Sequence, residues 1–76
     1  MFDYLSGRMR QLGIRQYDLA RMIDMDKSSM SHRFTGRTPW TLTEMYQVLD
    51  IIREPYEKLH IYFPRDGVSH QEGAML

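Results

Sequence analysis

The chain has 76 residues with 42% apolar side chains and no cysteine, which suits one small globular domain and excludes a disulfide scaffold, thiolate metal sites and cysteine catalysis. Ten basic and ten acidic residues give a formal net charge of zero, and that number alone does not favour binding to nucleic acid. No apolar run approaches the roughly 18 residues of a membrane span, and the first residues lack the basic and apolar stretches of a secretory signal, so we expect a cytoplasmic protein.

Two short helices are predicted in the first third of the chain. Apolar residues recur at helical spacing over residues 4–12, which predicts an amphipathic helix. Asp3 suits the N-cap of this helix, and Gly13 suits the position just past its end. A second helix is expected over residues 16–23.

A tight acidic turn is expected next. Asp24 can adopt the left-handed backbone conformation that such a turn requires, and Asp26 is a favourable N-cap. The helix that follows is predicted over residues 27–35. Its buried edge is marked by Met30 and Phe34, which are four positions apart.

The second half of the chain predicts two further helices. Thr41 and Glu44 have the spacing of a capping box, which opens the fourth helix. Its expected apolar stripe is formed by Leu42, Met45, Tyr46, Leu49 and Ile52. Pro55 fits the first position of a fifth helix that reaches about Phe63.

These predicted elements describe an all-α fold of five short helices without a strand. Connections of two to five residues are typical of a compact helical domain. We place this domain in residues 1–64 and expect residues 65–76, which show little periodicity, to form a flexible C-terminal tail.

The second and third predicted helices have the layout of a helix-turn-helix, in which the second of the two helices lies in a DNA major groove. At 100° per residue, the outward side of the third helix is small, polar and free of acid. Charge is also asymmetric: residues 8–40 hold seven cations against three anions, whereas residues 41–76 hold three cations against six anions. Ordinary surface helices show a polar outward side too, so the pattern by itself leaves DNA binding and a plain solvated helix both open.

The run of residues 12–31 resembles the lambda-repressor-like helix-turn-helix family of the Cro and XRE type. The family pattern is Gly-x-Thr-Gln-x-x-Leu-Ala, then a glycine turn, then a helix with Ile or Val at its fourth position. The residues that match this pattern in position are Gln16, Leu19, Ala20, Met25 and Met30. With the fourth and fifth helices, the likeness reaches about residue 63. It implies a small sequence-specific transcriptional regulator of double-stranded DNA, of the kind that phages and prophages use as repressors.

The resemblance also implies which residues contact DNA. The first, second and sixth positions of the reading helix, which contact bases in this family, are Lys27, Ser28 and His32, with Ser29 as a lesser candidate. Gln16 matches the family glutamine that holds a DNA phosphate. The further candidates for phosphate contact are Arg15, Ser31, Arg33, Thr35, Arg37, Thr38 and Trp40.

The sequence departs from the family pattern at three positions. Arg15 replaces the usual Thr or Ser cap and offers a phosphate contact instead, and Asp24 replaces the turn glycine. Arg33 stands where the family is usually apolar, so we expect Phe34 to fill that volume and Arg33 to lie on the flank, open to phosphate. Trp40 can lie along the DNA backbone or plug the core, and core packing is the favoured reading.

Surplus apolar residues late in the chain predict a partner. Ile51 lies off the fourth-helix stripe, and Ile61, Tyr62 and Phe63 exceed what one face of a short fifth helix needs. We expect these four residues to form a homodimer interface that sets two reading helices on a palindromic operator. The alternative is that they merely seal a small core.

Other functional classes have less support. His32, His60 and His70 are too scattered for a metal site, and no nucleophile motif or glycine-rich phosphate loop is present. We therefore expect no enzyme activity, no metal and no cofactor. The alternative function is a protein-interaction module on the same scaffold, an antirepressor or antitoxin-like adaptor that acts on another repressor protein. Salt dependence separates the two functions, because phosphate-driven DNA binding weakens steeply as salt rises.

Overall fold

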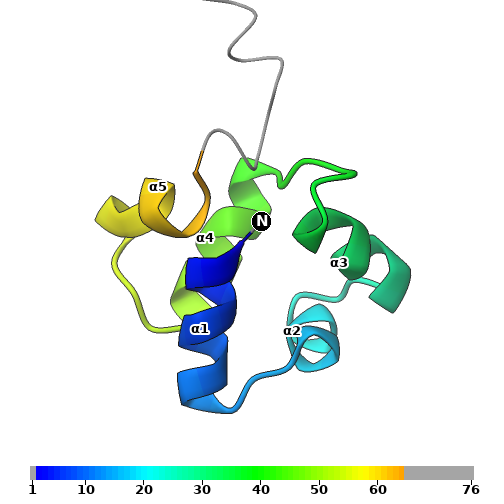
Figure 1. Cartoon of the computed structure of the whole chain (residues 1–76), viewed down its shortest axis with the longest axis horizontal. Coiled ribbons are helices and arrows are strands. Elements are labelled where there is room, and N and C mark those ends of the chain that lie inside the picture. Colours follow the sequence, from blue (N-terminus) through cyan, green and yellow to red (C-terminus); the bar gives the residue numbers. More distant parts are fainter. Residues whose placement is uncertain (1, 65–76) are drawn as a thin grey trace, which may run out of the picture.

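The computed structural model of the chain describes residues 2–64, and this part contains five α-helices, one 3₁₀ helix and no strand. The elements in chain order are α1 (Asp3–Leu12), α2 (Gln16–Met22), α3 (Lys27–Phe34), α4 (Leu42–Ile51), η1 (Tyr56–Lys58) and α5 (Leu59–Tyr62). The predicted all-α fold of five helices is confirmed. Helices α1 and α5 lie on one side, α2 and α3 lie on the other, and α4 stands between them (Figure 1). None of these helices is long and apolar enough to cross a membrane. The expected tail, residues 65–76, lies outside the described residues.

Helix α1 begins one residue earlier than predicted. Its N-cap is Phe2, and Asp3 is the first helical residue, so the predicted N-cap is wrong. Phe2 is buried, and burial of its ring fixes the chain at this point, so no side-chain cap is needed. The other end matches the prediction: Gly13 has φ +72°, and Ile14 N–H donates to the Met9 carbonyl at 2.9 Å.

The joint between α2 and α3 follows the predicted acidic turn. Helix α2 ends at Met22, and Asp24 has φ +60°, the left-handed conformation that the turn requires. Met25 N–H donates to the Ala20 carbonyl at 2.8 Å and closes the turn. Asp26 is the N-cap of α3, as predicted, because its carboxylate accepts from the backbone N–H of Ser29 at 3.1 Å.

Replacing Asp24 by glycine should raise the free energy of unfolding by about 1 kcal/mol, because glycine adopts a positive φ without a Cβ clash. Arg53 also has a positive φ of 61°, and Arg53→Gly should gain at least as much, since Asp tolerates this conformation better than Arg. Urea denaturation measures both changes. The control is Gln47→Gly, in the exposed interior of α4, which should lose about 1 kcal/mol. A gain at Gln47 or a loss at Asp24 would contradict the strain argument.

Helix α4 has the predicted start but a different buried face. The Thr41 hydroxyl accepts from Glu44 N–H at 3.2 Å, and the Glu44 carboxylate accepts from Thr41 N–H at 3.1 Å, so the capping box is confirmed. The face that meets the core consists of Met45, Val48 and Leu49, together with Ile52 at the C-cap. Two members of the predicted stripe are wrong, since Leu42 is 55% exposed and Tyr46 is 36% exposed.

The predicted fifth helix is divided into two parts. Pro55 is extended, with ψ 153°, and precedes the single 3₁₀ turn of η1. The α-helical part, α5, covers only Leu59–Tyr62. Helix α5 turns back onto α1 and α4 and contacts both of them.

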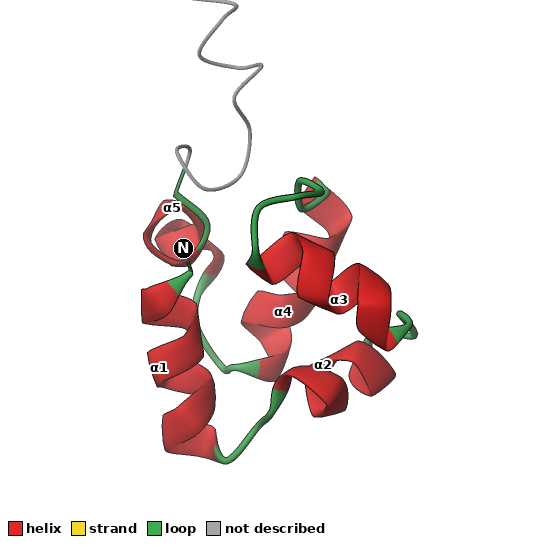
Figure 2. Ribbon diagram, turned by 45° about the vertical axis from the view of Figure 1, so that its right-hand side comes forward, coloured by secondary structure: helices red, strands yellow, loops and turns green. Residues whose placement is uncertain are grey.

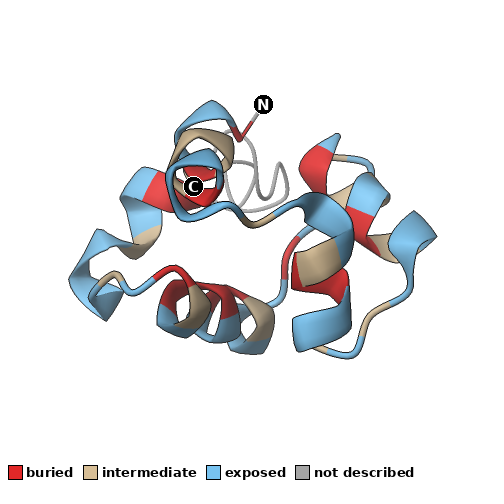
Figure 3. Cartoon of the chain, turned by 90° about the horizontal axis from the view of Figure 1, so that it is seen from below, coloured by how far each residue is buried: buried red, intermediate tan, exposed pale blue. Residues whose placement is uncertain are grey.

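Four aromatic rings from distant parts of the chain form the centre of the core. The Trp40 ring lies 6.2 Å from Phe2, 5.6 Å from Phe34 and 5.0 Å from Phe63, measured between ring centroids. The arrangements are edge-to-face, which aromatic rings prefer. Buried positions of the helices face one another across the middle of the molecule (Figure 3). The ends of the described chain are thereby joined to the loop that follows α3.

Candidate nucleic-acid interface

Helices α2 and α3 pack against each other through small and flexible apolar side chains. Leu19 and Ala20 of α2 and Met30 of α3 are fully buried in this contact region. Figure 2 shows α2 lying next to α3, with the turn at one end of both helices. The buried residues orient α3 so that its opposite side faces outward.

The outward side of α3 carries most of the residues predicted to contact bases. Lys27, Ser28, Ser31 and Thr35 are exposed, and His32 is half-buried. No ion pair or side-chain hydrogen bond involves Lys27, Ser28 or Ser31 within residues 2–64, so their polar groups are available to a ligand. No acidic side chain belongs to α3 itself.

Ser29 is committed to the start of the helix. Its hydroxyl donates to the Asp26 carboxylate at 2.7 Å, while its N–H donates to the other carboxylate oxygen at 3.1 Å. These two hydrogen bonds lower the pKa of Asp26 below its usual range, so the carboxylate is ionised at neutral pH. Of the four predicted base-contacting residues, Ser29 is therefore the least available.

The loop after α3 is held by one backbone carbonyl. The His32 carbonyl accepts from Arg37 N–H at 2.9 Å, from Thr38 N–H at 3.2 Å and from the Thr35 hydroxyl at 3.2 Å. The Arg37 guanidinium lies 3.5 Å from the His32 ring nitrogen Nε2. Arg37 is exposed and Thr38 is half-buried, so the loop presents a cation at a fixed place beside the end of α3.

The start of α2 presents the predicted phosphate contacts Arg15 and Gln16, both exposed. Arg15 is the N-cap residue, and its N–H donates to the Asp18 carboxylate at 3.0 Å. Its guanidinium donates to the Tyr17 hydroxyl at 2.8 Å. Tyr17 was not predicted as a site residue. The only signal in the sequence is an aromatic residue directly after Gln16.

Arg33 does not lie on an open flank, so the predicted position open to phosphate is wrong. Its guanidinium donates to both carboxylate oxygens of Glu44, at 2.9 and 3.0 Å, and both side chains are mostly buried. Phe34 does fill the apolar volume, as expected. Because the planar guanidinium matches the carboxylate, the pair ties α3 to the first turn of α4.

Trp40 is also removed from the surface. Its side chain is 3% exposed and lies in the aromatic cluster, so the indole cannot reach a phosphate. The favoured alternative, a plug in the core, is confirmed. The neighbouring loop residues Arg37 and Thr38 remain at the surface.

The predicted dimer interface loses most of its residues to the core. Tyr62 and Phe63 are buried within the chain, and Ile51 is half-buried against the same core. Only Ile61, at 45% exposure, presents its side chain outward. The alternative, in which these residues seal a small core, holds for Tyr62 and Phe63.

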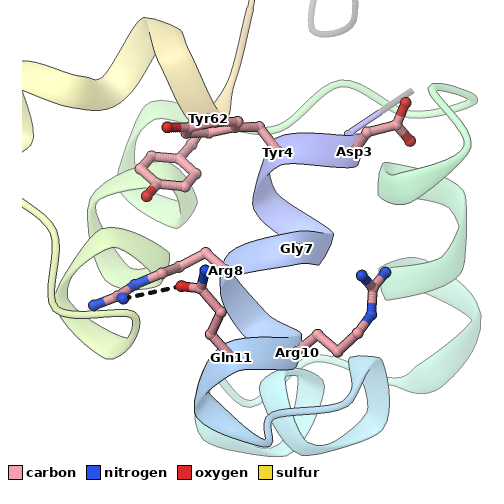
Figure 4. Close-up of a pocket in the computed structure, with 7 residues that line it drawn as sticks. All are labelled: Asp3, Tyr4, Gly7, Arg8, Arg10, Gln11 and Tyr62. Carbon is pink, nitrogen blue, oxygen red and sulfur yellow. Dashed lines mark hydrogen bonds between the residues drawn. The ribbon is translucent and has the colours of Figure 1, made fainter.

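A hollow lies over α1 and is lined by Asp3, Tyr4, Gly7, Arg8, Arg10, Gln11 and Tyr62 (Figure 4). The rings of Tyr4 and Tyr62 are 5.1 Å apart at one end of it. Arg8 donates to the Ile52 carbonyl at 3.1 Å and pairs with Glu54 at 3.2 Å. These contacts join α1 to the end of α4. The Arg8 side chain, which lines the hollow, is therefore occupied by helix packing.

Residues 2–64 contain no group of three or more His, Asp or Glu side chains that could hold a metal ion. Comparisons with protein-family models, with curated proteins and with solved structures give no match to this chain. The chemistry of the exposed residues therefore carries the functional argument.

Proposed function

We propose that the protein is a sequence-specific regulator that binds double-stranded DNA, with α3 in the major groove. The observation that carries this proposal is the outward side of α3, where Lys27, Ser28 and Ser31 are exposed and unpaired within the described chain. A helix fits the major groove when its outward side chains are small or can hydrogen-bond. Lys27 can donate to guanine, and a serine can donate or accept at either base type.

Three structural features support the resemblance to the lambda-repressor-like family. The helices occur in the expected number and order, and α2 and α3 are joined by a left-handed turn at Asp24. Gln16 is the first residue of α2 and is exposed, as a phosphate contact requires. In this proposal Arg15, Gln16 and Arg37 hold the DNA backbone, while Lys27, Ser28 and His32 contact bases.

Regulation would follow from occupancy of an operator. A protein bound over a promoter excludes polymerase by its volume, which makes repression the simplest outcome. A homodimer on a palindromic operator belongs to the proposal, although Ile61 alone of the four predicted interface residues is exposed. Half-sites about one helical turn apart would be the mark of such a dimer.

A selection from random duplex DNA tests the proposed function. The purified protein is compared with a Ser28→Ala, His32→Ala double variant at physiological salt. We expect the wild-type chain to enrich one sequence motif and the variant to lose it. A two-fold symmetric motif would establish a dimer. No enrichment by the wild-type chain would overturn the proposal and favour the protein-interaction module.

Replacing Lys27 by alanine should weaken binding to the selected sequence by about 1–3 kcal/mol and relax the preference at one base position. The lysine is the first residue of α3 and is exposed, so truncation should not alter the fold. Competition binding against single-base substitutions measures the preference. An equal loss on every sequence would mean that Lys27 contacts a phosphate and reads no base.

A further inference from the structure

Tyr17 is an exposed aromatic side chain with an unusual hydrogen bond. It is 45% exposed on α2, yet its hydroxyl is held by the Arg15 guanidinium at 2.8 Å. The guanidinium carbon also lies 5.8 Å from the centre of the ring. Two flexible side chains are therefore held together at the surface, next to the residues proposed to contact DNA.

Two hollows lie at the α2–α3 joint, and Tyr17 and Lys27 line both of them. One of them, which we call the α2–α3 slot, is lined by Gln16, Tyr17, Lys27 and Met30 and contains no carboxylate. The other hollow is lined by Asp24 and Asp26 as well as by Arg21 and Lys27, so its two carboxylates balance its two cations. Of these two hollows, the slot is the one with a positive net charge, since Lys27 is the one charged residue that lines it.

The hydrogen-bond direction determines which ligand fits. A phenol has one donor and acceptor lone pairs. Because Arg15 donates to the Tyr17 oxygen, the Tyr17 O–H is left to donate elsewhere, and no acceptor for it is found within residues 2–64. The Arg15 donation also polarises the phenol and makes it a better donor. Tyr17, Arg15 and Lys27 then present donors, which is the pattern that a phosphate oxygen accepts.

We infer that the α2–α3 slot holds one backbone phosphate of duplex DNA, with the Tyr17 hydroxyl as the donor that Arg15 positions. This inference rests on the proposed function. It adds Tyr17 to the contact residues and gives Arg15 a second role besides its own charge. The phosphate would lie beside the first turn of α3, and it would fix how deeply Lys27 and Ser28 enter the groove.

The test measures binding to random-sequence duplex DNA over a range of salt concentrations. Tyr17→Phe should lower affinity about tenfold while the salt slope stays unchanged, since a neutral hydrogen bond to a charged group is lost. Arg15→Gln should lower affinity and reduce the slope by about 0.9, because one phosphate loses its cation. In the double variant, Tyr17→Phe should cost less than it does alone, because the phenol is no longer polarised by Arg15.

Matched controls come from the other side of the molecule. Tyr4→Phe removes a phenol from α1, and Lys58→Gln removes a cation from η1; both should bind DNA like the wild-type chain. Thermal unfolding checks that each variant is folded. If the wild-type chain binds DNA and Tyr17→Phe binds equally well, the slot is overturned and the proposed function stands. If the wild-type chain does not bind duplex DNA, the slot and the proposed function are both overturned. The same holds if the chain binds inorganic phosphate but no duplex DNA.

Discussion

Replacing Trp40 by alanine should lower the free energy of unfolding by about 4 kcal/mol. The indole is buried against the rings of Phe2, Phe34 and Phe63, so truncation loses its apolar transfer energy and leaves a cavity. A domain of 76 residues has a total stability of roughly 4–11 kcal/mol. The variant should therefore be partly unfolded at physiological temperature. Urea denaturation measures the loss. Far-ultraviolet circular dichroism is the signal to follow, because Trp40 is the one tryptophan of the chain and the variant has no tryptophan fluorescence.

The variant Trp40→Phe distinguishes the contribution of the ring volume to stability from the cost of burying the indole nitrogen. The indole Nε1 is buried and has no hydrogen-bond partner within the described chain. Phenylalanine removes this unsatisfied donor, and that gain offsets part of the lost volume, so the net cost should be about 1 kcal/mol. The same variant should bind DNA like the wild-type chain, because the indole is not at the surface. A loss below about 1 kcal/mol for Trp40→Ala would contradict the central place of this residue.

Three of the helix boundaries could be predicted because they depend on near neighbours. Gly13 ends α1 through its own positive φ, and Asp26 begins α3 through a hydrogen bond to a residue three positions on. Thr41 and Glu44 open α4 in the same way. All of these contacts lie within one turn, which a linear pattern of residue types can record.

The buried face of α4 could not be predicted in the same way. Apolar residues occur on nearly every side of this helix, so several stripes satisfy the 3.6-residue period. The fold buries Val48 and leaves Tyr46 exposed, since these residues lie on opposite sides of the helix, about 160° apart. Tyr46 instead stacks with Tyr56 of η1, at 4.6 Å between ring centroids. The positions of the other helices determine which face of α4 is buried, and the sequence of α4 alone does not specify that face.

The placement of the candidate residues at the surface was predicted best where their side chains have no partner in the described chain. Nothing in the described chain binds the side chains of Lys27 and Ser28, and their position on the helix sufficed to predict that they are exposed. Arg33 was misplaced, and Trp40 was left open between the surface and the core, because their partners are distant in sequence. Arg33 meets a carboxylate eleven positions away, and Trp40 meets the ring of Phe2. Local periodicity carries no record of such contacts.

Replacing Arg33 by methionine should cost about 3 kcal/mol at neutral pH, because the carboxylate of Glu44 would keep its charge without its partner. The Glu44 side chain is 17% exposed and would lose hydrogen bonds of 2.9 and 3.0 Å. Methionine has a similar length and a similar helix propensity, so the cost would not come from the backbone of α3. Urea denaturation of the two proteins side by side measures it.

The pH dependence identifies the cause of that loss. In the wild-type chain burial raises the pKa of Glu44, but hydrogen bonds from Arg33 and Thr41 outweigh it and leave the pKa below its ordinary value of 4.5. A carboxyl with a lowered folded pKa stabilises the fold above its unfolded pKa, and this contribution is lost as pH falls through the folded value. Without Arg33, its hydrogen bond and its charge no longer lower the pKa of Glu44, so the pKa rises from its wild-type value. The difference in stability between Arg33→Met and the wild-type chain should therefore shrink as pH falls below 4.5.

A double variant, Arg33→Met with Glu44→Gln, distinguishes a stranded charge from lost packing. Glutamine can keep the capping box through its amide oxygen while it removes the charge, so the double variant should recover most of the loss at neutral pH. Glu57→Gln, at an exposed position of η1, controls for the loss of one carboxylate and should change little. If the double variant is no more stable than Arg33→Met, the stranded charge is not the cause. If it is stable but binds the selected DNA more weakly, the ion pair serves mainly to hold α3 at the angle from which Lys27 and Ser28 reach the groove.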